Sequence, residues 1–263
     1  MAHQTAFASV GLAIDQLLSS LKSGGLAVQT PSASGKTLLE KEGLARMIDH
    51  TLLKPDATAT DIRKLCEEAC AYKFATVCVN SSWIPLAAEL LRDSQTQPIA
   101  VVGFPLGACL TSAKAFETKE AIHLGAREID MVLQIGALKD GNHAAVFEDI
   151  QQVVAAAGPI LVKVILETAL LSQEQKVVAC ALAKAAGAAF VKTSTGFVPG
   201  GATVEDISLM RQVVGPTLGV KASGGIRSHT DAIKMIEAGA TRIGASASIT
   251  IVTQTGAAQA GQY

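Results

Sequence analysis

From Gly43 onward the chain alternates between two kinds of segment. Short runs rich in apolar and β-branched residues predict buried strands, and each is followed by a longer segment with helical periodicity. Glycine often stands between them, as in LGAREID, AAGAAFV and EAGATRI, because a left-handed residue ends a helix before the next strand begins. Eight strands are predicted, at residues 46–53, 74–80, 99–104, 127–134, 160–166, 188–194, 217–223 and 241–246.

Two of the predicted helices have clear end signals. TSAKAFETKEAIHLG (111–125) would be capped by Thr111 or Ser112 and would end at Gly125. SQEQKVVACALAKAAG (172–187) has Ser172 as its N-cap and Gly187 as its stop. Strands that alternate with helices in this way predict parallel βαβ units.

Such units close either as an open doubly wound sheet or as a (β/α)8 TIM barrel. An open dinucleotide-binding sheet would show GxGxxG after its first strand, but here that strand leads into LLKPDAT. We therefore predict a (β/α)8 barrel over residues 39–254 with an N-terminal extension. Residues 1–38 are interpreted as an accessory segment, with a short amphipathic helix at 13–21 and a flexible linker at 22–36, and residues 255–263 as a flexible tail.

Composition narrows the class of protein. The 263 residues are 49% hydrophobic and 17% charged, which is typical of a soluble globular chain. The formal net charge is −1 and no basic block stands out, which argues against nucleic-acid binding. No apolar run reaches the length of a membrane span, and the N-terminus lacks the basic region of a signal peptide. Five cysteines without CxxC spacing favour a reducing compartment, so we predict a cytoplasmic protein.

No metal and no cofactor are predicted. Cys66 and Cys70 are one helical turn apart, but no further ligands are near them in the sequence, so core packing explains them better. The five histidines form no HxH or HExxH pattern.

Three lysines stand inside apolar strands: Lys163, Lys192 and Lys221 each follow a valine. Charged residues are poorly tolerated on either side of a barrel strand. Lys163 alone could be a structural group paired with Glu167 or Asp130. Three lysines together, with aspartates at matching depth, are better explained by chemistry, because burial and crowding would depress their pKa values.

The size of that shift decides whether a lysine can act as a nucleophile. An ordinary lysine, with a pKa near ~10.4, is less than roughly 0.1% neutral at pH 7. A pKa of about 7–8 would raise the free amine by two to three orders of magnitude. This pattern predicts Schiff-base chemistry on a carbonyl substrate.

Two loops of small residues suggest phosphate binding. SGGIRS (223–228) follows the seventh predicted strand and GASAS (244–248) follows the eighth. In barrels these loops and the helix starts behind them are the usual phosphate site.

The chain also resembles the deoxyribose-phosphate aldolase family of class I aldolases. The motifs that carry the resemblance are IDHTLLKPDAT, VCVN, VVGFPLG, EIDMVLQIGALKDG, VKVILET, FVKTSTGF, VKASGGIR and RIGAS, which span about residues 47–248. The resemblance implies a (β/α)8 fold and the reversible cleavage of 2-deoxy-D-ribose 5-phosphate into acetaldehyde and D-glyceraldehyde 3-phosphate. It implies no metal and no cofactor.

The same resemblance implies roles for individual residues. Lys192, in KTSTG, would form the Schiff base, Lys221 would lower its pKa, Asp130 would move protons with Lys221, and the terminal Tyr263 would assist at C2. Substrate binding would fall to Asp49, Thr51, Cys78, Lys163 and Thr195. Phosphate binding would fall to Gly196, Gly224, Gly225, Gly244 and Ser246. Phe197 stands where some members carry a phosphate-binding lysine.

Other functions stay open on the sequence alone. One is another phosphosugar class I aldolase or a transaldolase, and a second is a non-catalytic barrel that binds a sugar phosphate. The expected partner is a small phosphorylated sugar or aldehyde. Barrels of this kind often form homodimers, although no interface can be identified in the sequence.

Overall fold

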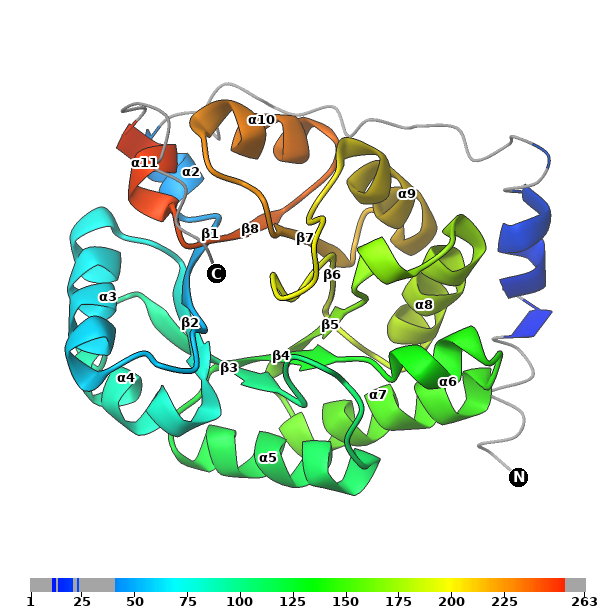
Figure 1. Cartoon of the computed structure of the whole chain (residues 1–263), viewed down its shortest axis with the longest axis horizontal. Coiled ribbons are helices and arrows are strands. Elements are labelled where there is room, and N and C mark those ends of the chain that lie inside the picture. The colour runs from blue at the N-terminus through cyan, green and yellow to red at the C-terminus, as the bar shows by residue number, and fades with distance from the viewer. Residues whose placement is uncertain (1–10, 13, 21–22, 24–40, 254–263) are drawn as a thin grey trace.

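The computed structural model describes residues 11–12, 14–20, 23 and 41–253. Eight parallel strands close into a barrel in sequence order, with β8 pairing back onto β1. The helices form a ring around it (Figure 1). This is the predicted (β/α)8 architecture.

Seven strands are shorter than predicted and lie within the predicted ranges, and β3 has the predicted length but begins two residues earlier. They are β1 Ile48–Leu52, β2 Thr76–Asn80, β3 Gln97–Val102, β4 Glu128–Val132, β5 Leu161–Ile165, β6 Phe190–Lys192, β7 Gly219–Ser223 and β8 Arg242–Ala245.

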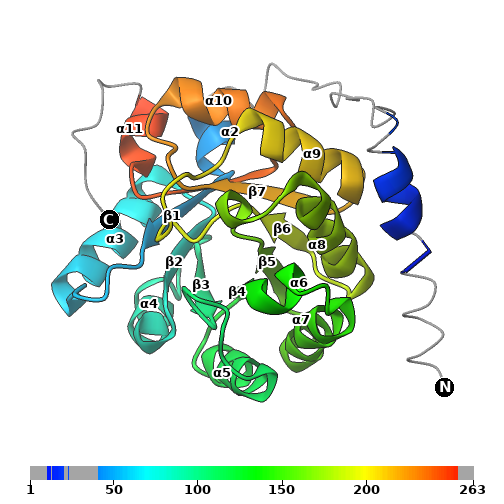
Figure 2. The same cartoon turned by 45° about the vertical axis from the view of Figure 1, so that its right-hand side comes forward.

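Helices follow the strands around the barrel, and the views in Figures 1 and 2 show them on its outer side. They are α2 Lys41–Ala45, α3 Ala59–Tyr72, α4 Ile84–Leu90, α5 Thr111–His123, α6 Ile135–Lys139, α7 His143–Ala157, α8 Gln173–Ala185, α9 Val204–Val214, α10 His229–Glu237 and α11 Ser248–Thr253. Two short 3₁₀ turns cover Ser81–Trp83 and Thr168–Leu170. Within the described ranges no helix has the length and apolar character needed to cross a bilayer.

The helix ends confirm one predicted cap and correct another. Ser172 caps α8 through a capping box with Gln175, as predicted, and Gly187 follows that helix with a φ of 86°. The N-cap of α5 is Leu110, which makes no side-chain cap. Thr111 is the first residue of this helix, and its Oγ1 instead donates to Asp149 Oδ1 at 2.9 Å. The Thr111 hydroxyl therefore bonds to α7 and does not cap α5.

Side chains alternate along each strand between two environments. The outward residues are aliphatic, such as Val77, Val164 and Val220, and belong to the main core packed against the helices. Each of β1 and β4 to β8 has at least one charged residue at an inward position, whereas the inward residues of β2 and β3 are uncharged. A separate cluster of Leu53, Cys78, Ile99 and Val101, with Phe104 against it, lines that apolar side. The barrel interior therefore has one polar wall and one apolar wall.

Part of the N-terminal extension is also described. Residues 14–20 are helical, within the predicted helix at 13–21. Ile14 is buried, and Leu17 and Leu18 pack against the main core. The predicted linker at 22–36 lies almost wholly outside the described residues, as does the tail. The domain boundaries at 38/39 and 254/255 stay predictions.

Close packing at the amino-terminal end of the barrel depends on one glycine. Gly219, the first residue of β7, pairs with Phe190, the first residue of β6. A Cβ at Gly219 would lie 2.1 Å from the Phe190 ring. The ring is also beneath two cations, with Lys163 Nζ 5.8 Å and Arg242 Cζ 5.5 Å from its centroid. Gly219 thus makes room for the aromatic floor of the barrel.

We expect Gly219→Ala to lower the free energy of unfolding by roughly 1–3 kcal/mol, because the new methyl group overpacks the floor against Phe190. Urea unfolding measures the change. Gly136→Ala is the matched control, since a Cβ there meets nothing within 4 Å and alanine favours the helix by roughly 0.5–1 kcal/mol. Equal stability of Gly219→Ala and the wild type would contradict the close packing described above.

Candidate active site

A closed ring of six charged side chains fills the polar side of the barrel interior. Cations and anions alternate around it, so each side chain contacts an opposite charge on both sides. In order around the ring they are Arg242, Asp49, Lys221, Asp130, Lys163 and Glu128. They come from β8, β1, β7, β4 and β5, because each strand turns an inward position toward the barrel axis.

Asp130 holds the end of the ring that faces the substrate side. Its Oδ1 lies 2.9 Å from Lys163 Nζ, and its Oδ2 lies 2.7 Å from Lys221 Nζ. Lys163 also contacts Glu128 Oε2 at 2.5 Å. The structure thus pairs Lys163 with Asp130 and Glu128, where the sequence had left Asp130 and Glu167 as alternatives.

Asp49 and Arg242 close the ring toward the amino-terminal end of the barrel. Asp49 Oδ2 lies 2.5 Å from Lys221 Nζ, and Asp49 Oδ1 lies 2.7 Å from Arg242 Nη1. Thr76 Oγ1 donates to the same Oδ1 at 2.6 Å. Arg242 then meets Glu128 from the opposite side of the barrel, with two contacts of 3.4 Å.

Lys192 lies beside this ring and is attached to it at one point. Its Nζ contacts Asp130 Oδ2 at 2.9 Å. In the part of the chain that the structure describes, each cation of the ring has two carboxylate partners and Lys192 has one. The ring holds three positive and three negative charges and is neutral without Lys192. A proton on Lys192 would leave an uncompensated charge in a buried site, which is costly.

The pKa values of the three lysines diverge for the same reason. Burial, reinforced by the neighbouring Lys221, lowers the pKa of Lys192, although Asp130 opposes the shift. The pKa of Lys221 is raised, because attraction by Asp130 and Asp49 outweighs its burial. The pKa of Lys163 is likewise raised, with Asp130 as its strongest attractive partner. The expectation that crowding depresses all three lysines is therefore wrong for Lys163 and Lys221, because the carboxylates between them were not counted.

The carboxyl groups of the ring show the complementary shifts. Burial alone would raise the pKa of Asp130, but Lys163, Lys192 and Lys221 hold it well below its usual range. Burial likewise acts against ionisation of Asp49, and Lys221 and Arg242 nevertheless lower its pKa. Both groups are therefore carboxylates at neutral pH.

Cys78 and Thr51 stand at the edge of this charged cluster. Cys78 is fully buried on β2, and burial raises the pKa of its thiol, so it presents an uncharged surface next to Lys192. Thr51 donates its hydroxyl hydrogen to Asp49 O at 2.8 Å.

A buried carboxylate that the sequence analysis did not choose as a site residue fixes the loop after Lys192. Glu167 follows β5 with a φ of 57°, an uncommon left-handed conformation for a residue with a side chain. Its Oε2 accepts from Thr195 N at 3.2 Å and also from Thr195 Oγ1. Thr195 Oγ1 in turn accepts from Phe197 N at 3.1 Å. Glu167 thus anchors the Thr195–Gly196–Phe197 turn over the barrel.

The glycine-rich loops pack against one another. Gly224 and Gly225 have φ values of 85° and 77°, and Ala202 N donates to Gly224 O at 3.0 Å. A Cβ on Gly201 would come within 2.5 Å of that same oxygen. The loop after β6 therefore rests on the loop after β7 through glycine backbone.

The other predicted phosphate residues lie at the same end of the barrel. Gly196 has a φ of 88° in the turn after Lys192. Ser246 is exposed directly after β8. Gly244 lies inside β8, where a Cβ would come within 2.9 Å of Lys221 Cε, so its clearest role is to make room for that lysine.

An aromatic pair spans the mouth of the barrel. Phe104, after β3, and Phe197, after β6, meet edge to face with ring centroids 5.2 Å apart. In Figure 1 the yellow segment after β6 turns toward the middle of the ring of strands. The pair thus joins the loop after β3 to the loop after β6. Tyr263 lies outside the described residues.

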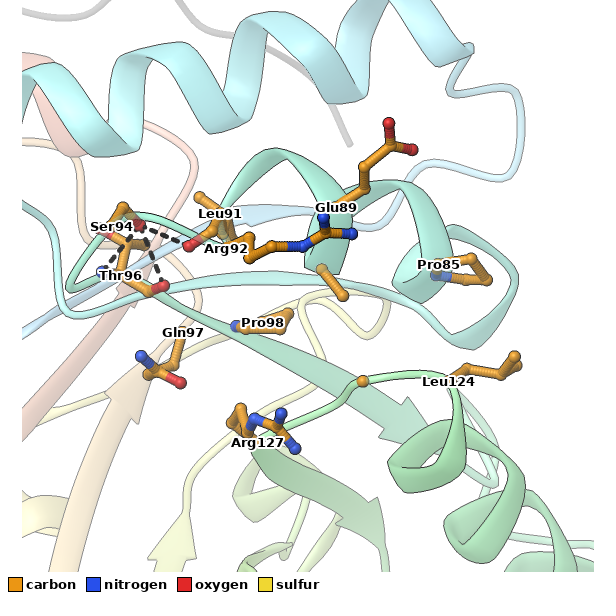
Figure 3. Close-up of a pocket in the computed structure, with 12 residues that line it drawn as sticks. Pro85, Glu89, Leu91, Arg92, Ser94, Thr96, Gln97, Pro98, Leu124 and Arg127 are labelled. Carbon is orange, nitrogen blue, oxygen red and sulfur yellow. Dashed lines mark hydrogen bonds between the residues drawn. The ribbon is translucent and has the colours of Figure 1, made fainter.

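A pocket lies near the amino-terminal ends of β3 and β4. It has a volume of about 490 Å³, and Figure 3 shows Arg92, Pro98, Leu124 and Arg127 among its lining residues. Because Pro98 and Arg127 stand at the amino-terminal ends of β3 and β4, this pocket is remote from the predicted site. Among the described residues no group of three or more histidine, cysteine or acidic side chains is placed to hold a metal ion.

The sequence analysis missed Glu128 and Arg242 as members of the charged cluster. The available signal was their spacing. Glu128 is two residues before Asp130, and Arg242 two before Gly244, so each shares an inward-facing side of its strand with a chosen residue.

Comparison with known proteins identifies the family. The family model described as DeoC/LacD family aldolase matches residues 44–259. The chain belongs to the DeoC/LacD family of aldolases. The match covers the whole described barrel, including every member of the ion ring.

Relatives of this DeoC/LacD family aldolase have a consistent description. A deoxyribose-phosphate aldolase from Halalkalibacterium halodurans is 62% identical over 211 residues, 80% of this chain and 94% of that protein. One from Bacillus mycoides is 60% identical over 210 residues, with the same coverage. The solved deoxyribose phosphate aldolase from Aeropyrum pernix, described as tetrameric, is 33% identical with a TM-score of 0.77, covering 82% of this chain and 92% of that one.

The buried carboxylates of this family aldolase predict a steep loss of stability in acid. A carboxyl group whose folded pKa is lowered stabilises the fold above its unfolded pKa of about 3.9, and this stabilisation is lost as the pH falls through the folded pKa. We therefore expect the free energy of unfolding to fall below about pH 4, by up to about 1.4 kcal/mol per pH unit for each such group.

Asp130→Asn removes one of these groups and should make the acid dependence shallower by up to one proton. Urea unfolding at several pH values between about 6 and 3 measures both slopes. Identical slopes in the two proteins would show that Asp130 takes up its proton in the folded state at an ordinary pH.

Proposed function

We propose that this protein is a deoxyribose-phosphate aldolase that cleaves 2-deoxy-D-ribose 5-phosphate reversibly through a Schiff base on Lys192. The observation that carries the proposal is the neutral ring beside Lys192. A neutral ring favours the free amine, and the free amine is the form of lysine that attacks a carbonyl. The names of relatives at 60% and 62% identity support the same substrate.

The reaction follows from an amine at this position. Lys192 Nζ attacks C1 of the open-chain sugar, and loss of water leaves a protonated imine. This cation withdraws electrons as the bond between C2 and C3 breaks, while the C3 hydroxyl loses its proton. Glyceraldehyde 3-phosphate leaves, and the remaining enamine is protonated at C2. Hydrolysis of the imine then releases acetaldehyde and restores the amine.

Asp130 and Lys221 are the residues that we propose to move these protons. The charge of the imine takes the place of an ammonium next to Asp130, so the carboxylate stabilises the intermediate without moving. Lys221, held charged between Asp49 and Asp130, can hold a water near C3 and C2. Tyr263 would assist at C2 from the tail.

Substrate binding divides between the two walls of the barrel. The proposal places the sugar hydroxyls near Asp49, Thr51, Lys163 and Thr195, and the methylene at C2 near Cys78. The phosphate would lie on Gly196, Gly224, Gly225, Gly244 and Ser246. Exposed backbone at Gly225 and at Ser246 is consistent with an anion arriving from solvent.

The remaining proposals concern the setting of the enzyme. Five free cysteines fit a reducing compartment such as the cytoplasm. The homodimer stays a prediction, and the solved Aeropyrum pernix protein is described as a tetramer.

Borohydride reduction in the presence of deoxyribose 5-phosphate should fix a two-carbon or five-carbon adduct on Lys192. Peptide mass mapping locates it, and Lys192→Met is the control that should give none. An adduct on another lysine, or no adduct in the wild type, would contradict the mechanism. Cleavage of a different phosphosugar with the same adduct would favour the alternative class I aldolase.

Lys221→Leu should lower kcat by at least about 100-fold while thermal unfolding stays cooperative, because a proton carrier and a ring cation are both lost. Steady-state kinetics and calorimetry measure the two effects. Lys176→Leu is the matched control, since it removes a lysine paired with Asp206 at 2.6 Å outside the barrel. Near wild-type kcat in Lys221→Leu would refute the role of Lys221.

A further inference from the structure

Two members of the ion ring lie far from any reacting atom. Glu128 is the first residue of β4 and Arg242 the first of β8, so both stand at the amino-terminal end of the barrel. Neither contacts Lys192. They meet one another from opposite sides of the barrel, and each reaches the substrate end through one intermediate: Glu128 through Lys163, and Arg242 through Asp49.

We propose that Glu128 and Arg242 are positioning residues that set the charge state of Lys192 by keeping the ion ring closed and neutral. The inference rests on the proposed Schiff-base role of Lys192 and adds to it a control from the opposite end of the barrel.

Charge balance is the first argument. With all six members charged, the ring has no net charge. The ring and Lys192 together are neutral only when Lys192 has lost its proton. Loss of Arg242 would leave the cluster with an excess negative charge, which a proton on Lys192 would cancel. Loss of Glu128 would leave an excess positive charge, which would disfavour that proton further. The two residues therefore act in opposite directions.

Geometry is the second argument. Asp130 Oδ2 is shared by Lys221 and Lys192, at 2.7 and 2.9 Å. The attraction that Asp130 can offer Lys192 depends on how fully Lys163 and Lys221 already engage that carboxylate. Glu128 holds Lys163 in place, and Arg242 holds Asp49, which contacts Lys221. A substitution of Glu128 or Arg242 therefore alters how Asp130 is held, and Asp130 is the carboxylate partner of Lys192.

The surroundings of Lys192 leave few other groups to carry this effect. Asp130, Lys221 and Cys78 act directly on Lys192. The other titratable or charged groups at inward strand positions and in the loop after β5 are Asp49, Glu128, Lys163, Glu167 and Arg242. The inward positions of β3, Gln97, Ile99 and Val101, carry no charge. All but Cys78 and Glu167 belong to the ring.

The test measures the charge state of Lys192 without requiring turnover. Formaldehyde and cyanoborohydride methylate neutral amines, and peptide mass spectrometry follows Lys192 as a function of pH. We expect Arg242→Gln to move the midpoint of this reactivity up by about one pH unit, and Glu128→Gln to move it down by about one. Glu128 is three ion-pair contacts from Lys192 and Arg242 is four. A unit charge on the order of 10 Å away shifts a pKa by about one unit at an effective dielectric constant of about 20.

Three controls separate charge from structural damage. The double variant E128Q/R242Q restores neutrality and should return the midpoint to within about 0.3 of the wild-type value. Two structural defects that shift the midpoint in the same direction would instead leave the double variant further displaced than either single variant. Arg242→Lys keeps the charge and should keep the midpoint. Arg127→Gln removes the exposed arginine next to Glu128 and should have no effect, because solvent screens it.

Each outcome decides the proposal. Opposite shifts that cancel in the double variant support it. Shifts of the same sign, no shift in either single variant, or a double variant whose midpoint stays displaced from the wild-type value would overturn it. The single variants are judged separately, so one unstable variant leaves the sign of the other to decide. Failure of the aldolase proposal would appear instead as absent deoxyribose 5-phosphate cleavage with the midpoint shifts intact.

Discussion

The structure depends on how the barrel accommodates charges where a core would normally be apolar. Six ionised groups are withdrawn from water, and desolvation of each would cost several kcal/mol without compensation. Closure of the ring provides that compensation, since every member has an opposite charge on both sides. If the same six side chains formed an open series, the two at its ends would each have only one partner of opposite charge. The circular symmetry of eight strands allows β8 and β4 to meet across the axis, so the fold and the ion ring support one another.

Small residues on the neighbouring strands are part of the same solution. Long side chains from five strands must converge on the axis, and they need space there. Gly244 gives room to Lys221, and Gly219 gives room to Phe190, whose ring forms a floor below Lys163 and Arg242. The apolar wall of β2 and β3 completes the enclosure, because it excludes water from one side and strengthens the ion pairs on the other.

The sequence predicts the fold better than it predicts which charged side chains pair with one another in the site. Strand positions and the barrel follow from local periodicity and from glycine punctuation, which depend on residues near one another in the chain. The ring joins Asp49 to Arg242, 193 residues apart, and Asp130 to Lys221, 91 residues apart, and no local pattern encodes such pairs. Counting lysines suggested mutual repulsion, but the outcome depended on which carboxylates stood between them. The cap of α5 failed for a similar reason, since Thr111 found a tertiary partner in Asp149.

The position of Lys192 beside the ring, and not within it, links stability to chemistry. A lysine with two carboxylate partners gains stability by staying charged, which makes it a poor nucleophile. A lysine far from any carboxylate could be neutral but would have nothing to stabilise the cationic imine that follows. Lys192 shares one oxygen of Asp130 with Lys221, so burial lowers the pKa of Lys192 while an anion stays in contact for the positive nitrogen of the proposed imine. The same oxygen also contacts Lys221, so the approach of charge on Lys192 weakens the hold of Asp130 on Lys221. In the proposed mechanism, this eases proton release from Lys221 at the stage when a proton is needed at C2.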